Sequence, residues 1–388
     1  MENILLLNKI AKVGLDVLDP TRYQAGTEVK NPTGILVRSA KMQDMTFGPE
    51  LLAIARAGAG VNNIPVDRCA KEGIVVFNTP GANANGVKEL AVCALLLASR
   101  RVVEGIEFAR SLAGTPDVAK QVEAGKSQFA GTEILGKTLG VIGLGAIGGM
   151  VANAAVHLGM NVIGCDPYLS VEGAWNLSHH VKKAATYEEV FAAADYITLH
   201  VPATESTKGM INRDSIAQMK NGVKIINLAR AELVNAADLR AAMESGKVSA
   251  YVTDFPTEET VEIPGALVIP HLGASTEESE DNCAVMAARE LSDYLRFGNI
   301  RNSVNYPTVE MPESGSTRVC VLHANVPAVL SSITAVFSGR GINIENMLNK
   351  SKGENAYTMV DIAGEAGEEI VSAIRAVEGV RRVRVICF

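Results

Sequence analysis

The stretch Thr138-Leu-Gly-Val-Ile-Gly-Leu-Gly-Ala-Ile-Gly148 decides the fold of this chain. A short β-prone run is followed by Gly143, Gly145 and Gly148 in G-x-G-x-x-G spacing, and the glycines open a helical pattern. Strand, glycine turn and helix in this order are typical of a dinucleotide site, where backbone N–H groups and the helix dipole face the diphosphate. A glycine turn alone is weak evidence, but here its context is complete.

The next carboxylate along the chain supports the same site. Asp166 ends the following expected strand, about twenty residues after the turn, where a carboxylate accepts hydrogen bonds from ribose hydroxyls. A carboxylate there repels a 2′-phosphate, so the expected cofactor is NAD rather than NADP. The alternative is a turn aspartate before Pro167, and the complete strand, turn and helix favour the cofactor role.

Short apolar runs alternate with helical patterns through most of the chain, which predicts parallel α/β architecture. An early series of expected strands covers residues 4–7, 35–37, 53–57 and 74–77. A second series covers residues 139–142, 162–165, 196–199, 224–227, 249–252 and 267–269. Six strands with helical crossovers predict a complete doubly wound, Rossmann-type cofactor domain.

The order of the elements predicts three domains. The helical pattern at 277–297 is expected to return to the first domain, which makes a discontinuous, flavodoxin-like substrate domain at 1–90 and 275–300. The NAD-binding domain at 91–274 is inserted in it, and the polar residues 301–316 predict a linker. Residues 317–388 follow the order βαββαβ of the ferredoxin-like fold.

Composition limits the class of partner. The chain has 388 residues, 47% hydrophobic and 20% charged, with a net charge of −7, so a soluble globular protein without a general nucleic-acid surface is expected. Six scattered cysteines form no CxxC pair, which favours reduced thiols and no metal site. The N-terminus lacks a signal-peptide pattern, and the longest apolar run, 91–98, is too short to cross a membrane. We therefore expect a cytoplasmic protein.

Three polar stretches lie where strands of the second series end. They are Asn227-Leu-Ala-Arg230, Phe255-Pro-Thr-Glu258 and Pro270-His271-Leu-Gly-Ala-Ser-Thr276. The carboxyl ends of adjacent parallel strands form the crevice in which such sheets bind ligands. Arginine can hold a carboxylate bidentately, and histidine beside a carboxylate can exchange a proton near neutral pH. Each residue alone could be an ion pair or a core residue, but together they predict a site.

These stretches resemble the D-isomer-specific 2-hydroxyacid dehydrogenase family, whose motifs read N-x-[AS]-R-G, D-V-F-x-x-E-P and P-H-[IL]-G. Further segments match in family order, and the resemblance extends over residues 1–300. It implies NAD-dependent interconversion of a 2-hydroxy acid and its 2-oxo acid. It also implies that Arg230 binds the substrate, that His271 is the acid–base and that Glu258 orients it. The cofactor-binding residues that it implies, besides the three glycines and Asp166, are Ala146, Ile147, His200, Pro202, Leu228, Ala229, Asp254, Gly273 and Ala274.

The chain departs from the family pattern at three places. Ala231 replaces the glycine after the catalytic arginine, Thr253-Asp254 replaces Asp-Val, and Glu259 replaces the proline. The nicotinamide contact therefore falls on either Thr253 or Asp254. The orienting carboxylate is Glu258 or Glu259, and the spacing within the motif favours Glu258.

Within the family, loops of the first domain resemble those of members that act on a phosphorylated substrate. Arg38, Ser39, Arg56 and Gly60 follow early strands, and a phosphate needs cationic and N–H partners. One alternative is the reduction of another 2-oxo acid, such as hydroxypyruvate, glyoxylate or 2-oxoglutarate. A second is a non-catalytic NAD-sensing interaction protein, and retention of the three catalytic residue types weighs against it.

The carboxyl-terminal domain resembles an ACT regulatory module. Its turn, which includes His323 and Asn325, could hold a small carboxylate at a helix N-terminus. The resemblance implies that His323, Asn325 and Asn343 bind an amino-acid effector, L-serine, between subunits of a homodimer or homotetramer. Ala328 stands where related modules have glycine, so the alternative is a dimerisation domain without a ligand.

Overall fold

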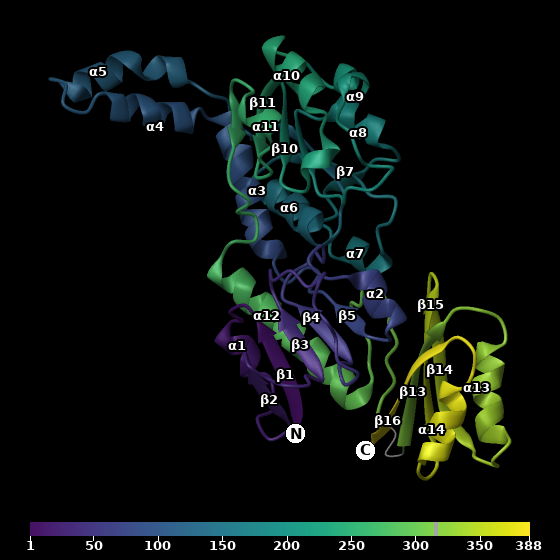
Figure 1. Ribbon diagram of the computed structural model, residues 1–388. Helices are drawn as coiled ribbons and strands as arrows, with labels where there is room; N and C mark the ends of the chain where they lie inside the picture. The colour runs from purple at the N-terminus through teal and green to yellow at the C-terminus, as the bar shows by residue number, and fades with distance from the viewer. Residues whose placement is uncertain (314–316) are drawn as a thin grey trace. The chain divides into compact units, whose positions relative to one another are not determined.

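The computed structural model describes residues 1–313 and 317–388, which form two compact units (Figure 1). Unit 1 combines Met1–Asn83 with Glu277–Phe388, and unit 2 is Ala84–Thr276. The expected limit at residue 90 falls inside helix α3 (Ala84–Ser99), which belongs wholly to unit 2. Residues 314–316 of the expected linker lie outside the described residues.

Unit 2 is built on a parallel sheet with the order β12-β11-β10-β9-β6-β7-β8. All six expected strands are present, and the sheet gains a short edge strand, β8. From β8 to β11 the order is the 3-2-1-4-5-6 of a doubly wound dinucleotide fold, which confirms the prediction. The strands are β6 (Thr138–Ile142), β7 (Asn161–Cys165), β8 (Val181–Lys183), β9 (Tyr196–Leu199), β10 (Val223–Asn227), β11 (Val248–Thr253) and β12 (Ala266–Val268).

Helices cover both faces of this sheet because its strands are apolar on both sides. Residues of α3 and α6, such as Leu95 and Val151, share one core with the sheet, and residues of α8 and α10, such as Phe191 and Leu239, share the other. Helices α4 and α5 form a hairpin that projects from the rest of unit 2 (Figure 1). The remaining helices are α4 (Val102–Ser111), α5 (Val118–Gly125), α6 (Ala146–His157), α7 (Val171–Trp175), α8 (Tyr187–Ala193), α9 (Arg213–Gln218), α10 (Ala236–Glu244) and α11 (Glu258–Val261).

Unit 1 contains a second parallel sheet with the order β2-β1-β3-β4-β5, which is the flavodoxin-like order and confirms that prediction. Helices α1 and α12 pack on one face, where Ala287 and Leu291 are fully buried. The other face is covered around α2, where Cys69 is fully buried. The elements are β1 (Glu2–Leu7), α1 (Lys12–Leu15), β2 (Tyr23–Gly26), β3 (Gly34–Val37), β4 (Ala53–Arg56), α2 (Val66–Lys71), β5 (Val75–Phe77) and α12 (Glu277–Phe297).

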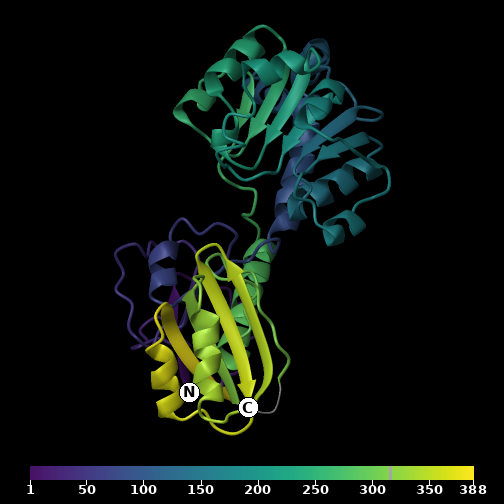
Figure 2. The ribbon, with the colours of Figure 1, turned by 90° about the vertical axis from the view of Figure 1, so that its right-hand side faces the viewer.

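The carboxyl-terminal part of unit 1 is an antiparallel sheet with the order β14-β15-β13-β16, as expected for βαββαβ. Helices α13 and α14 cover one face of it (Figure 2), where Val321, Ile333 and Ile374 form the core. We call residues 317–388 the ACT module. Its elements are β13 (Thr317–Ala324), α13 (Val329–Ser338), β14 (Ile344–Lys352), β15 (Asn355–Ile362), α14 (Glu368–Arg375) and β16 (Val380–Cys387).

The opposite face of the ACT sheet packs against the rest of unit 1. Leu322, Tyr357 and Met359 share a single core with Tyr294 and Leu295 of α12. This follows from strand alternation, since β13 and β15 are apolar on both faces. The ACT module is therefore continuous with the core of the substrate unit.

The polar stretch after α12 is also packed. The Asn305 side chain accepts a hydrogen bond from Val76 N and donates one to Ile74 O, both at 2.9 Å, so its amide extends the edge of β5 as a strand would. Tyr306 is fully buried and donates to Ala70 O at 2.7 Å. Residues 305 and 306 thus run along the sheet of unit 1.

One buried carboxyl group on α12 makes the stability of unit 1 depend on pH. Glu290 is 7% exposed, and burial raises its pKa to about 7, although Asn302 donates a hydrogen bond to it at 2.6 Å. Since the unfolded chain loses this proton near the ordinary value of 4.5, the folded form binds it more tightly. The contribution of Glu290 is therefore most favourable at low pH and falls as the pH rises from about 4.5 through 7.

We expect Glu290→Gln to raise the free energy of unfolding by about 2–3 kcal/mol near pH 8, and to have little effect near pH 5. Urea unfolding at the two pH values measures this difference. The exposed Glu277 of the same helix, replaced by glutamine, is the matched control and should change neither value. An equal gain at both pH values would show that Glu290 is not the titrating group.

Within residues 1–313 and 317–388, no helix combines the length and the apolar character needed to cross a membrane. Over the same residues, no three His, Cys, Asp or Glu side chains are grouped so that they could hold a metal ion.

Candidate active site

The glycine turn after β6 has the geometry of a nucleotide cradle. Gly143 has φ +88°, and an added Cβ would lie 2.6 Å from the carbonyl oxygen of His200. A Cβ on Gly148 would lie 1.9 Å from the carbonyl oxygen of Gly143, so neither position accepts a side chain. A Cβ on Gly145 would meet nothing within 4 Å, which leaves open space at the N-terminus of α6. Two glycines permit the turn, and the third leaves room for a diphosphate.

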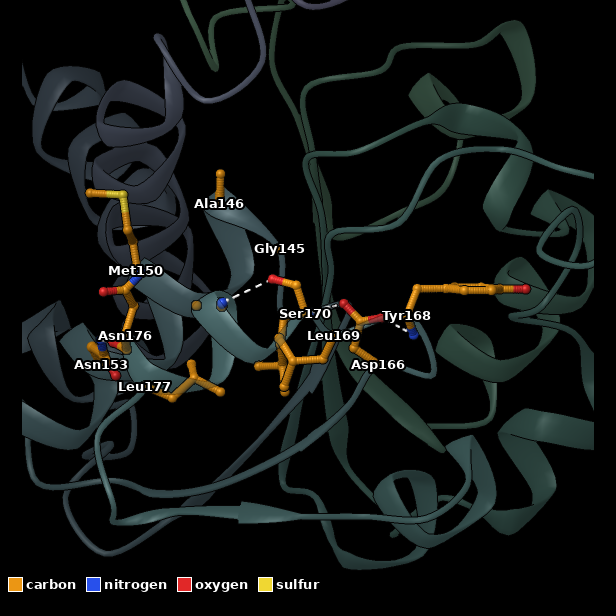
Figure 3. A pocket seen from close by; sticks show the side chains of 13 residues that line it. Gly145, Ala146, Met150, Asn153, Asp166, Tyr168, Leu169, Ser170, Asn176 and Leu177 are labelled. Atoms are coloured by element: carbon orange, nitrogen blue, oxygen red, sulfur yellow. Dashed lines mark hydrogen bonds between the residues drawn. The ribbon is translucent and has the colours of Figure 1, made fainter. Parts of the chain in front are cut away.

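Asp166 lies at one side of this turn, in a cavity of about 430 Å³ (Figure 3). Its Oδ2 accepts a hydrogen bond from Leu144 N at 2.8 Å, and its Oδ1 accepts one from Tyr168 N at 2.8 Å. The Tyr168 ring points away from Gly145 in this view. Because each carboxylate oxygen can accept more than one hydrogen bond, Asp166 can fix the glycine turn and still receive ribose hydroxyls. The cavity thus connects the N-terminus of α6 with the Asp166 carboxylate, as a nucleotide site requires.

We expect Asp166→Asn to narrow the preference for NAD over NADP about tenfold, because the variant keeps an acceptor oxygen but no longer repels a 2′-phosphate. Asp166→Ala should also weaken NAD itself, since Leu144 N loses its partner. Titration of both variants with NAD and NADP separates the effect of the Asp166 charge from the effect of its hydrogen bond to the glycine turn. Unchanged selectivity in both variants would remove Asp166 from the cofactor site.

The remaining predicted cofactor residues follow the carboxyl ends of the parallel strands, which lie at one edge of the sheet. Ala146 and Ile147 follow β6, His200 and Pro202 follow β9, Leu228 and Ala229 follow β10, Asp254 follows β11, and Gly273 and Ala274 follow β12. Burial lowers the pKa of His200 to about 4, so its imidazole is neutral. Its Nε2 meets Thr198 Oγ1 at 2.9 Å, and its buried Nδ1 has no partner among the described residues. His200 therefore carries a neutral ring, and its backbone carbonyl adjoins the glycine turn.

The two candidates for the nicotinamide contact have different surroundings in the structure. Thr253 is fully buried, donates from Oγ1 to Asn227 O at 2.8 Å and accepts from Phe255 N at 3.1 Å. Asp254 is 1% exposed, and its Oδ2 accepts from Gly273 N at 2.9 Å. Its buried Oδ1 has no partner within the described chain, and burial raises its pKa. The unsatisfied oxygen favours Asp254 as an acceptor for an amide N–H.

Arg230 and His271 both contact the ring of Phe255. The guanidinium carbon of Arg230 lies 5.7 Å from the Phe255 centroid, and the His271 ring centroid lies 4.5 Å from it. Both functional side chains are exposed, so each can meet a ligand. Phe255 was predicted only as part of a motif, because its contacts with both side chains depend on β10, β11 and β12 being neighbours in the sheet.

Asn227 fixes the turn that carries Arg230. Its Nδ2 donates to Arg230 O at 2.8 Å, and its Oδ1 accepts from Ala229 N at 3.2 Å and Arg230 N at 3.3 Å. Asn227 is fully buried, so the turn has a single internal anchor. The N-x-A-R spacing was the available signal, because an asparagine side chain can bond the backbone two and three residues ahead.

Glu258 begins α11, whose N-cap Thr257 forms a capping box with Thr260. Both Glu258 and Glu259 are exposed in the first turn. In the part of the chain that the structure describes, neither glutamate hydrogen-bonds to His271. The choice between them stays a prediction in favour of Glu258.

The predicted substrate residues of unit 1 form a cluster around the ends of β3 and β4. Arg56 Nε donates to Arg38 O at 3.0 Å, and a Cβ on Gly58 would lie 2.4 Å from Arg56 Nη1, so this glycine makes room for the guanidinium. Asn8 Oδ1 accepts from Ser39 N at 2.9 Å. Gly60 lies in the loop after β4. Asn8 and Gly58 were not predicted, since their roles are visible only once the loops meet.

In the ACT module, Ala328 has φ +68°, a left-handed conformation that glycine adopts without strain. His323 is buried, and its ring nitrogens contact Ala324 O at 2.7 Å and Thr358 Oγ1 at 2.9 Å. Asn325 Nδ2 donates to Gly353 O at 2.9 Å, and Asn343 is exposed. The two asparagines are thus nearer to solvent than His323.

Comparisons with known proteins agree with this geometry. Residues 95–273 match the D-isomer specific 2-hydroxyacid dehydrogenase NAD-binding domain, and residues 319–382 match an AHAS small subunit-like ACT domain. The D-3-phosphoglycerate dehydrogenase of Haemophilus influenzae is 30% identical over 353 residues, which cover 87% of this chain and 82% of that protein. The chain belongs to the D-3-phosphoglycerate dehydrogenase family. Membership confirms the resemblance drawn from the sequence motifs.

Other members of the D-3-phosphoglycerate dehydrogenase family are longer. The enzyme of Archaeoglobus fulgidus is 33% identical over 320 residues, which cover 78% of this chain but only 58% of that protein. The NAD⁺-bound 3-phosphoglycerate dehydrogenase of Entamoeba histolytica has a TM-score of 0.62 and 27% identity, covering 78% of this chain and 98% of that one. The family fold therefore extends over most of the present chain.

Proposed function

We propose that this chain is an NAD-dependent dehydrogenase that oxidises 3-phosphoglycerate to 3-phosphohydroxypyruvate in serine biosynthesis. The main support for this proposal is that Arg230 and His271 both contact the ring of Phe255. They lie at the same edge of the sheet as the glycine turn. Bound NAD supplies the hydride acceptor. Arg230 holds the substrate carboxylate, and His271 takes the proton of the C2 hydroxyl as that carbon loses its hydride. Glu258 stabilises the imidazolium that results.

Arg38 and Arg56 favour a phosphorylated substrate over the alternatives. The guanidinium groups of Arg38 and Arg56 suit a phosphate better than a neutral hydroxymethyl group. The test compares NADH oxidation with 3-phosphohydroxypyruvate and with unphosphorylated hydroxypyruvate. We expect a kcat/KM at least about 100-fold higher for the phosphorylated acid. Equal values would favour a reductase of another 2-oxo acid, and no turnover of either would favour an NAD-sensing protein.

We propose that the ACT module binds a small amino acid, L-serine, through Asn325 and Asn343. The left-handed Ala328 precedes α13, and its methyl group lies where a ligand would approach the backbone. Calorimetry with L-serine on the wild type and on Ala328→Gly tests this. Binding in the wild type that is lost in Asn325→Ala supports the site, and binding only after Ala328→Gly shows that the methyl group closes it. No binding in either leaves the module as an assembly device.

We infer a homodimer or homotetramer from two exposed surfaces. Helices α4 and α5, which the structure describes completely, contain no buried residue, and Val102, Ile106 and Val118 are more than 40% exposed. The edge strand β14 is mostly exposed along its length. Light scattering on Ile106→Glu and on Met347→Lys tests each surface. A smaller assembly in a variant supports the surface that carries the substitution. An unchanged mass in both variants contradicts the assignment of both surfaces.

We also infer a cytoplasmic location. All six cysteines are free, and four of them are buried. Reduced, buried thiols suit a compartment in which disulfides do not form. Fractionation of the native host tests this inference.

A further inference from the structure

The cationic cluster of unit 1 contains a carboxylate that the proposed chemistry does not use. Glu280, in the first turn of α12, lies 2.5 Å through Oε1 from Nη2 of Arg38. Both side chains are 43% exposed. Among the described residues, this is the single hydrogen bond that the Arg38 guanidinium makes, so its other N–H groups remain available to a ligand. The contact is one-sided and not the bidentate fork of a structural arginine–carboxylate pair.

The same carboxylate belongs to a group of charges around Cys283, one turn further along α12. Burial raises the pKa of the Cys283 thiol, and the charges of Arg56, Arg38 and Glu280 all act on it. Arg56 contacts the backbone of Arg38, and the Glu280 carboxylate contacts the Arg38 guanidinium. The carboxylate therefore offsets one of the two positive charges of the arginines.

Glu280 is held in this place by a rigid helix. A Cβ on Gly14 would lie 2.6 Å from Ala284, so α1 packs directly on the backbone of α12. At the other end of α12, Arg318 donates to Phe297 O at 2.9 Å, Tyr357 to Gly298 O at 2.6 Å, and Arg384 to Tyr294 O at 2.8 Å. These donors come from the ACT module and satisfy the last carbonyls of the helix. Glu280 is thus a fixed acid beside Arg38.

We propose that Glu280 competes with the phosphate of the substrate for Arg38 and so sets the affinity of the site for phosphorylated ligands. The inference rests on the proposed function. A phosphate carries a charge of about −1.5 to −2 at neutral pH, so a neighbouring carboxylate repels it while also occupying its partner. An unphosphorylated acid has no charge at that end, and its binding is indifferent to Glu280. Glu280 is in this sense a specificity-determining residue that weakens phosphate binding.

Weaker binding of the phosphate serves turnover. Substrate and product carry the same phosphate, so this contact contributes uniform binding, which lowers KM without raising kcat. A site of charge +2 would hold the product as tightly as the substrate and slow its release. Glu280 therefore lowers affinity and leaves the rate of turnover high.

The test is Glu280→Gln in the full chain, which removes the charge and keeps the shape. We expect the Kd and the KM for 3-phosphoglycerate to fall about tenfold, while kcat does not rise. Kinetics with D-glycerate should give an unchanged KM. The matched control is Glu278→Gln, which removes the same charge from the same helix turn at an exposed residue that forms no salt bridge within residues 1–313 and 317–388. It should change the KM for 3-phosphoglycerate less than about twofold, because salt screens an exposed charge that does not contact the ligand.

Three results would overturn the proposal. A higher KM for 3-phosphoglycerate in Glu280→Gln would mean that Glu280 holds Arg38 in its binding position. An equal fall in KM in Glu278→Gln would show that the effect comes from the total charge of the protein. An equal fall in the KM for D-glycerate would show that the effect does not depend on the phosphate. Failure of the proposed function is recognised separately, because the wild type would then prefer unphosphorylated substrates before any variant is made.

Discussion

Replacement of Arg230 by lysine should lower kcat/KM for the 2-oxo acid by about 100-fold, although the positive charge is kept. The planar guanidinium lies 5.7 Å from the Phe255 centroid, and its Nη1 donates to Ala229 O at 2.6 Å, so its orientation is set from two sides. An ammonium group has neither the fork for a carboxylate nor the flat face for Phe255. Steady-state kinetics with 3-phosphohydroxypyruvate measure the loss.

The loss should fall on the substrate and not on the cofactor. The Kd for NADH should remain within about twofold of the wild-type value, since Arg230 is not in the glycine turn. Arg213→Lys, at an arginine whose side chain is 85% exposed, is the control and should be as active as the wild type. Wild-type kcat/KM in Arg230→Lys would show that the carboxylate is bound elsewhere.

Asp361→Asn should lower the free energy of unfolding of unit 1 by about 3–5 kcal/mol. Asp361 and Arg318 are both 0% exposed, and they are joined by two hydrogen bonds of 2.7 and 2.9 Å. The amide nearly preserves the shape of the carboxylate but leaves the buried guanidinium without a counter-charge. Urea unfolding followed by far-ultraviolet circular dichroism gives the difference.

The control for this variant is an ion pair that water can reach. Arg340 and Glu369 lie 3.2 Å apart in the ACT module, with Glu369 84% exposed. Glu369→Gln should change stability by less than about 1 kcal/mol, because exposed pairs contribute little. Similar effects of the two variants would mean that Arg318 is satisfied by its carbonyl partners alone.

The cofactor domain was predictable because its longer strands are mostly apolar and lie between turns, even where one polar residue interrupts them, as Lys224 does in β10. The strands that were missed are short and polar. Strand β8 consists of Val181-Lys-Lys183, and β2 consists of Tyr23-Gln-Ala-Gly26. Both lie at sheet edges, where a strand needs few apolar residues because one side is open to water.

The residues of the candidate site were predictable as far as motif order places them at strand ends. What the order of motifs could not reveal is how side chains meet across loops. The contacts of Phe255 with Arg230 and His271 and the pairing of Arg38 with Glu280 join residues far apart in the sequence. The packing of Asn305 along β5 could not be predicted for the same reason. A side-chain amide that bonds to a strand edge leaves no periodic pattern of apolar residues in the sequence.

The core that the ACT module shares with α12 has a consequence for any shortened form of the chain. Tyr294 and Tyr357 are almost completely buried, and Tyr294 is covered from the side of the module. A protein truncated before Thr317 would expose apolar side chains of α12 to water. It would also remove the hydrogen-bond donors that satisfy the last carbonyl groups of that helix. Such a truncation therefore removes part of the core of unit 1. The module and the substrate unit should melt together in a single calorimetric transition.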